Sequence, residues 1–108
     1  YAIFYSQNHN TQILLPDDYI LNQNYPNPFN PETTIEYYMP EDNNIELNIY
    51  NIKGEKVKNL YSGYLSSGYH SIVWDGDSDS GFELSSGIYI VSFKYGNNII
   101  NSKVAKIK

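Results

Sequence analysis

The sequence has 108 residues, 41% of them hydrophobic and 16% aromatic, and a formal net charge of -5 at pH 7. This length predicts one small domain, the aromatic content excludes a disordered chain, and the negative charge argues against a general nucleic-acid binder. The absence of cysteine excludes disulfide scaffolds, zinc–thiolate sites and cysteine nucleophiles. No apolar run is as long as a membrane-spanning helix, so we expect no membrane insertion. The chain begins with Tyr1 rather than Met, and we expect a fragment of a longer polypeptide.

The first residues have a different character from the rest. Two apolar triplets, Ile3–Tyr5 and Ile13–Leu15, flank a polar stretch. We interpret residues 1–20 as a linker or a partly docked N-terminal extension, with an extra edge strand as the alternative. Because proteases cut exposed linkers most readily, we expect residues 1–19 to be the least stable part of the chain and to contain or adjoin a processing site.

The next segment, residues 22–31, reads NQNYPNPFNP. Proline removes amide donors and Asn-Pro pairs favour turns, so this segment is predicted to be an extended, turn-rich entry to the domain proper at residues 21–108. Tyr25 and Phe29 are its predicted anchors on the edge of the fold.

The remainder of the chain alternates apolar and polar residues, as half-buried strands do, and shows no helical periodicity. Lys53-Gly54 predicts a tight hairpin turn, and the spacing of Val57 and Leu60 predicts a β-bulge in the return strand. Short strands separated by regular turn signals predict an all-β, antiparallel β-sandwich of six or seven strands. The predicted strands span residues 34–40, 44–51, 55–61, 69–75, 87–95 and 99–107, and the predicted core comprises Leu47, Ile49, Trp74, Tyr89, Val91 and Phe93.

Candidate chemistry is sparse. The alternating carboxylates of Asp75, Asp77 and Asp79 resemble a calcium-binding loop, but the positions that hold glycine and glutamate in an EF-hand are serines here. These three residues are therefore a weak candidate for a metal site. The alternative is an acidic loop that forms hydrogen bonds within itself. His9 and His70 lie in no metal-spaced cluster. We therefore expect a non-enzymatic domain with no catalytic residue and no cofactor.

Two surface features suggest binding. Tyr38, Tyr50, Tyr61 and Tyr64 are predicted on outward faces, where tyrosines stack on carbohydrate, although tyrosine is also simply favoured in strands. Residues 94–108 contain four lysines and no acid. We predict that the last strand is an exposed edge whose lysines are recognised by a partner. Deleting Val104–Lys108 is then expected to leave the sandwich largely folded. The alternative is an ordinary edge strand whose lysines only prevent pairing with other edges.

Several motifs together resemble one family. Leu21–Glu41 contains the run NPFNP, Ile45–Gly54 reads IELNIYNIKG, Gly68–Gly76 has the form G-x-H-x-x-x-W-D-G, Ser86–Tyr89 reads SGIY, and the chain closes with KVAKIK. Over residues 20–108 this combination resembles the type A C-terminal sorting domain of type IX secretion (Por secretion system) cargo. That domain is related to the immunoglobulin-like domain of the flagellar hook-capping protein.

The resemblance implies a seven-stranded immunoglobulin-like sandwich on a secreted or cell-surface protein of a Bacteroidetes-type bacterium. Its implied partners are the outer-membrane secretion machinery, a sortase-like protease that removes such domains, and an upstream cargo domain of the same chain, with no nucleic acid involved. The opening motif maps to Asn27, Pro28, Phe29, Asn30 and Pro31, and the sorting signal to Gly87, Tyr89, Lys103, Val104, Lys106, Ile107 and Lys108.

Two other functions stay open at this point. One is an accessory adhesive or carbohydrate-binding module attached to an extracellular enzyme. The other is a scaffold domain of the flagellar hook, which we expect to lie inside a longer chain.

Overall fold

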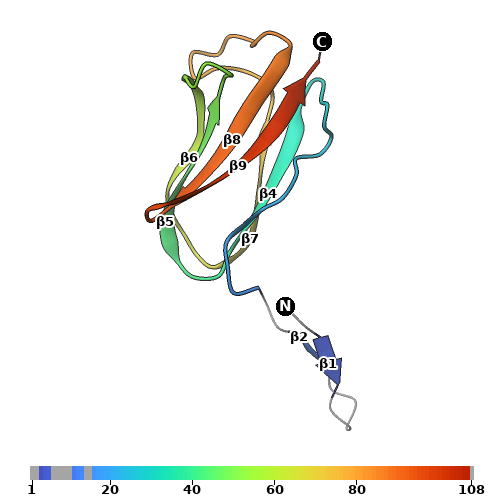
Figure 1. The fold of residues 1–108 in the computed structure, drawn as a ribbon, viewed down its shortest axis with the longest axis vertical. Helices are drawn as coiled ribbons and strands as arrows, with labels where there is room; N and C mark the ends of the chain where they lie inside the picture. The colour runs from blue at the N-terminus through green and yellow to red at the C-terminus, as the bar shows by residue number, and fades with distance from the viewer. Residues whose placement is uncertain (1–2, 6–10, 14–15, 108) are drawn as a thin grey trace.

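The chain forms an antiparallel β-sandwich in the computed structural model, which describes residues 3–5, 11–13 and 16–107 (Figure 1). Seven strands build the sandwich. They are β3 (Ile20–Leu21), β4 (Thr33–Met39), β5 (Asn43–Tyr50), β6 (Lys56–Leu65), β7 (Gly68–Trp74), β8 (Gly87–Tyr95) and β9 (Asn98–Lys106). Six of them correspond to the strands expected from the alternating pattern, although β6 extends to Leu65, and the short β3 was not expected.

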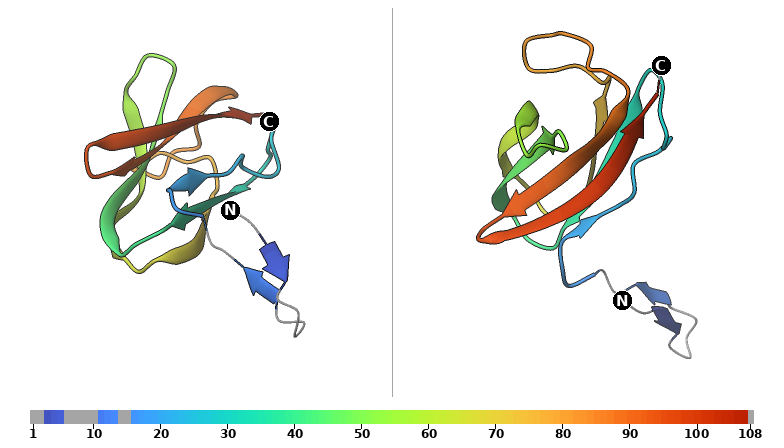
Figure 2. Two further views of the ribbon diagram at one scale, coloured as in Figure 1. Left: turned by 60° about the horizontal axis from the view of Figure 1, so that its bottom comes forward. Right: turned by 45° about the horizontal axis from the view of Figure 1, so that its top comes forward.

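The seven strands form two sheets, one of three strands in the order β3-β4-β7 and one of four in the order β6-β5-β8-β9. All neighbouring strands pair antiparallel. The prediction of an all-β, immunoglobulin-like sandwich of about seven strands is thus confirmed. Figure 2 shows the two sheets face to face, with β9 at one edge of the larger sheet. No helix of the described residues has the length and hydrophobicity to cross a membrane.

The first apolar triplet and Ile13 of the second lie in a separate small hairpin; residues 14 and 15 lie outside the described residues. Strand β1 (Ile3–Tyr5) pairs with β2 (Thr11–Ile13), and neither pairs with a strand of the sandwich. The first described contact with the core comes from Tyr19, whose ring stacks on Tyr95 at a centroid distance of 3.7 Å. Its hydroxyl donates to Glu41 and accepts from Asn43, at 3.0 Å each, so the end of the predicted linker is fixed on the sandwich.

The predicted bulge is present in β6. Leu47 pairs with Tyr61 and Asn48 with Asn59, so the extra residue between them is Leu60. A second register shift places Val57 outside the ladder in the same way. A bulge shifts the alternation of side chains by one residue. This shift explains how Val57 and Leu60, three positions apart, both pack against the core.

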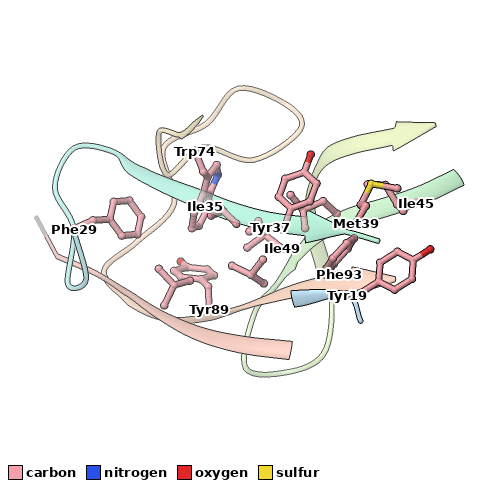
Figure 3. Close-up of a cluster of buried hydrophobic side chains, with 13 residues drawn as sticks. Tyr19, Phe29, Ile35, Tyr37, Met39, Ile45, Ile49, Trp74, Tyr89 and Phe93 are labelled. Atoms are coloured by element: carbon pink, nitrogen blue, oxygen red, sulfur yellow. The ribbon is translucent and has the colours of Figure 1, made fainter. Parts of the chain in front are cut away.

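The core lies between the two sheets and is rich in aromatic rings (Figure 3). All six residues predicted for it are buried, and Trp74, Leu47, Ile49, Val91 and Phe93 are at most 1% exposed. Phe29 and Tyr19 lie at opposite ends of the cluster in Figure 3, so segments preceding β4 close the core at both ends.

Two tyrosines differ from expectation. Tyr25 is 80% exposed and is therefore no anchor. Its backbone pairs with Thr34, and the neighbouring side chains of Asn24 and Thr33 turn inward and bond to each other. Tyr38 is buried rather than outward-exposed, because its ring packs on that of Tyr69 at 4.6 Å in the neighbouring strand.

Candidate functional site

The opening motif and the chain terminus meet at the edge of β9. The Phe29 N–H donates to the Ala105 carbonyl at 2.9 Å, and the Ile107 N–H donates to the Phe29 carbonyl at 3.0 Å. The Asn27 side-chain oxygen accepts from the Ala105 N–H at 2.9 Å. Residues almost eighty positions apart in the sequence are therefore hydrogen-bonded. We call this site, made of Asn27, Phe29, Gly76, Ala105 and Lys106, the motif junction.

Aromatic packing joins the junction to the core. The Phe29 ring lies 5.3 Å from that of Trp74, and Trp74 meets Tyr89 edge-on at 5.6 Å. The Trp74 indole N–H donates to the Asp77 carbonyl at 2.9 Å, so its polar atom is satisfied. The W-D-G and S-G-I-Y motifs thus supply the rings against which the opening motif packs (Figure 3).

Lys106 occupies the centre of the junction. Its side chain is buried, and its ammonium group lies 3.2 Å from the Glu83 carboxylate. Gly76 lies directly against it, because a β-carbon added at Gly76 would collide with Lys106 Cε. Gly76 also has a positive φ of 79°, a conformation that side chains disfavour. The glycine therefore gives the buried lysine its space.

The predicted sorting residues fall into two groups. Gly87, Lys103 and Ile107 are exposed, whereas Tyr89, Val104 and Lys106 are buried in or beside the core. Lys108 lies outside the described residues. In the opening motif Phe29 is fully buried, and Asn27, Pro28, Asn30 and Pro31 are exposed around it.

The prediction that the last strand displays its lysines along an open edge is wrong in its C-terminal half. Besides the junction contacts, Gln23 donates to the Lys103 carbonyl at 3.0 Å, so the segment before β4 covers the edge from Lys103 to Ile107. Lys106 is a core-facing residue with its own counterion. Alternation places Lys106 on the same side of the strand as Val104, but the acidic partner comes from a loop that strand patterns do not position.

The acidic loop is held by protein contacts. The carboxylate of Asp77 pairs with the Lys58 ammonium at 3.1 Å, and the carboxylate of Asp79 accepts from the Asn59 N–H at 3.0 Å. The hydrogen bond between Asp75 and Asp77 raises the pKa of Asp75. Burial alone would raise the pKa of Asp77, but the hydrogen bonds from Asp75 and Lys58 outweigh it and lower that pKa. Among the described residues, no three acidic or histidine side chains are grouped as a metal site requires.

The tyrosines predicted as a sugar platform do not share a surface. Tyr38 is buried, Tyr50 is half-buried at the end of β5, Tyr61 packs against the core opposite Leu47, and Tyr64 is 60% exposed at the far end of β6. Stacking on a sugar needs rings exposed side by side. These four positions therefore supply no such platform.

Several residues that hold the motif junction in place were not indicated by the sequence. Glu83 and Gln23 sit in irregular segments with no periodic signal. Asn24 and Thr33 bond to each other at 2.9 Å and both donate to the Pro26 carbonyl, which fixes the loop that carries Phe29. The Asn and Thr next to the proline-rich run were the available signal, since such side chains often bond to a neighbouring backbone.

We expect Gly76→Ala to destabilise the domain by about 1 kcal/mol more than Gly81→Ala. Both glycines have a positive φ, near 79° and 88°, so both substitutions carry a similar backbone cost of roughly 1–2 kcal/mol. Only at Gly76 does the new methyl group displace Lys106 from Glu83, since a β-carbon at Gly81 meets nothing within 4 Å. Urea unfolding of the two variants measures the difference, and equal losses would contradict the close packing at Lys106.

Comparison of the sequence with known protein families identifies one match. A family model described as the FlgD Ig-like domain matches residues 29–98. The match begins at Phe29 of the opening motif, includes the W-D-G loop and the S-G-I-Y strand, and ends before Lys103. No curated protein matches the chain.

Two solved structures from Porphyromonas gingivalis contain a similar fold. The crystal structure of dimeric latent PorU aligns with 95% of this chain at a TM-score of 0.65 and 18% identity. PorZ, described as an essential bacterial surface component of the type IX secretion system, aligns with 82% of this chain at a TM-score of 0.54 and 20% identity.

The chain corresponds to only 11% of the length of either structure, so each likeness concerns one part of a much larger protein. At these identities the likenesses establish the fold alone. The family match rests on the sequence itself and spans well over half of the chain, including most of the core described above. The chain therefore belongs to the FlgD Ig-like domain family.

Proposed function

We propose that this domain is a C-terminal sorting signal for type IX secretion, a ligand for secretion machinery rather than an enzyme. The observation that carries the proposal is the motif junction. The two motifs at the ends of the family resemblance, NPFNP and KVAKIK, lie side by side there through two backbone–backbone hydrogen bonds and one from the Ala105 N–H to the Asn27 side chain. The likeness to a part of PorZ, a surface component of that secretion system, is compatible with the same pathway.

The surface of the junction, not its buried interior, is then what a receptor contacts. Lys103 and, one residue past the end of β9, Ile107 lie on the same outer face, and Gly87 and the exposed residues of the opening motif flank that face. Val104 and Lys106 point the other way and hold the strand in place. The sorting signal thus consists of a folded edge with one exposed cation and one half-exposed aliphatic side chain.

The remaining steps of the proposal follow from the family resemblance. The domain follows a cargo domain in the same polypeptide, crosses the periplasm and outer membrane with it, and is removed at the surface by a sortase-like protease. Residues 1–19 are proposed to contain or adjoin the processing site, because the described hairpin β1–β2 pairs with no strand of the sandwich.

A reporter assay tests the receptor surface. The 108-residue chain is fused behind a secreted reporter in a Bacteroidetes-type host with type IX machinery, and Lys103→Glu with Ile107→Ser is compared with the unchanged domain. Both side chains are exposed, so stability should change by no more than about 0.5 kcal/mol per substitution. We expect the variant to fold, by circular dichroism, and to leave most of the reporter in the periplasm.

The matched control lies on the outer face of the other sheet, where Tyr69 and Val73 are 65% and 51% exposed. Tyr69→Ser with Val73→Ser removes a comparable apolar surface and should be exported normally. Normal export of the folded Lys103→Glu, Ile107→Ser variant would reject the sorting role of this surface and favour an accessory binding module.

A further inference from the structure

The outer face of the four-stranded sheet is apolar and basic on an otherwise acidic domain. Ile52, Ile88 and Ile99 are 79%, 44% and 57% exposed, and with Ile90 they line an open hollow of about 590 Å³ that Asn101 and Lys103 border. We call these four isoleucines the isoleucine face. A monomeric domain seldom gathers exposed aliphatic side chains on one sheet face without a binding role.

Charge concentrates on this face as well. Cross-strand partners share a side of a sheet, so Lys56 lies on the same face as Tyr50, Lys94 as Ile99, and Lys103 as Ile90. None of these three lysines is within ion-pair distance of a described carboxylate; the two described ion pairs use Lys58 and Lys106. Glu46, opposite Lys94, is the one acid in these cross-strand rows, although the whole chain carries -5.

The border of the face is an open stretch of strand edge. The backbone groups that point away from β8 at Lys103, Ala105 and Ile107 are hydrogen-bonded by Gln23, Asn27 and Phe29. By the two-residue period of a strand, Ile99 and Asn101 direct theirs the same way. No described residue bonds to those groups, so this part of the edge can accept another strand.

We propose that the open edge at Ile99–Asn101, together with the exposed side chain of Lys103 beyond it, is a docking site for an extended, acidic segment of a partner protein, which adds to the edge of β9. The outward side chains of the added segment extend the isoleucine face. A residue beside Ile99 and one just past the paired stretch, level with the Lys103 side chain, are four positions apart and point to the same side. The segment therefore carries an aliphatic residue and an acidic residue at that spacing. Main-chain hydrogen bonds give affinity and these two side chains give specificity, as in other strand-addition complexes.

A protein strand fits this surface better than an anionic lipid surface does. The hollow is lined by the amide of Asn101 and the hydroxyl of Ser92 as well as by isoleucines. These groups bond well to a peptide backbone, whereas burial in a lipid interface would leave them without partners. The proposal does not depend on the sorting function, because it concerns binding by the isolated domain.

Titration of the isotope-labelled 108-residue chain with the synthetic peptide TTITSTETT tests the site by NMR. We expect shifts confined to residues 88–92 and 98–103, and binding that weakens as salt is raised. The matched peptide TTITSTKTT should bind about tenfold more weakly, a difference of about 1.4 kcal/mol. Lys103→Glu should reverse this order of the two peptides, and that reversal would establish the pairing.

A second variant and a lipid probe complete the test. Ile99→Ser should weaken the acidic peptide about tenfold, whereas Tyr69→Ser on the other sheet should leave its binding unchanged. Equal binding of the two peptides, no binding of either, or shifts on the β3-β4-β7 sheet would overturn the proposal. So would sedimentation of the chain with phosphatidylglycerol vesicles without peptide binding, which would make the face a lipid-binding surface instead.

Discussion

Trp74→Ala is expected to destabilise the domain by about 3–5 kcal/mol, which is the usual cost of removing a fully buried aromatic side chain. Trp74 is 1% exposed and contacts both Phe29 and Tyr89, so its removal leaves a cavity where three motifs meet. It also leaves the Asp77 carbonyl without its indole donor. For a small domain with a stability of about 5–15 kcal/mol, this loss brings the chain close to unfolding.

Phe29→Ala provides an independent measurement of the same packing from the other side. Phe29 is fully buried, yet it belongs to an irregular segment and not to a strand. We expect a loss in the same range of about 3–5 kcal/mol. Val73→Ala, next to Trp74 but 51% exposed on the outer face, is the control and should cost less than about 1 kcal/mol. Urea melts in which Trp74→Ala and Val73→Ala are equally stable would contradict the assignment of faces on β7.

The sequence allowed the fold to be predicted because strand periodicity is a local signal. Side chains two residues apart share a face, so the burial of Tyr89, Val91 and Phe93 follows from their spacing alone. The bulge at Leu60 was also predictable, since only an extra residue reconciles its position with that of Val57. Such arguments use neighbours in the sequence and need no knowledge of which strands pair.

The candidate site was predicted less well because it is built from long-range contacts. Lys106 looks like a surface lysine in a basic tail, and only the fold shows that Gly76 leaves it space and that Glu83 neutralises it. Composition also could not show which of the two aromatic residues, Tyr25 or Phe29, anchors the opening segment. The contact of Asn24 with Thr33 decides which of the two aromatic rings turns inward.

This difference changes what deletion of the last strand is expected to show. The interpretation of β9 as a loosely attached edge predicts that removing Val104–Lys108 leaves the sandwich folded. The structure overturns that expectation, because Val104 is fully buried and Lys106 is 3% exposed. The same five residues also hold the Phe29 segment through the Ala105 and Ile107 backbone groups.

We therefore expect deletion of Val104–Lys108 to unfold most of the chain at room temperature. Burial of Val104 contributes about 1.5–3 kcal/mol, and each of the three lost bonds to Asn27 and Phe29 contributes about 1 kcal/mol. The Glu83 carboxylate loses its ammonium partner as well, and Phe29 loses the strand that positions it. Loss of the β-sheet signal in circular dichroism and collapse of amide dispersion in NMR spectra would show the unfolding.

Lys103→Glu is the control that separates folding from recognition. Lys103 lies one residue before the deletion, but its side chain is exposed, so the variant should keep its stability within about 0.5 kcal/mol. Failed export of the truncated chain does not separate unfolding from the loss of Ile107, whereas failed export of folded Lys103→Glu reports on a receptor contact. If the truncated chain instead kept a native spectrum and melting temperature, the junction would not hold the sandwich together, and its role would be limited to the outer surface.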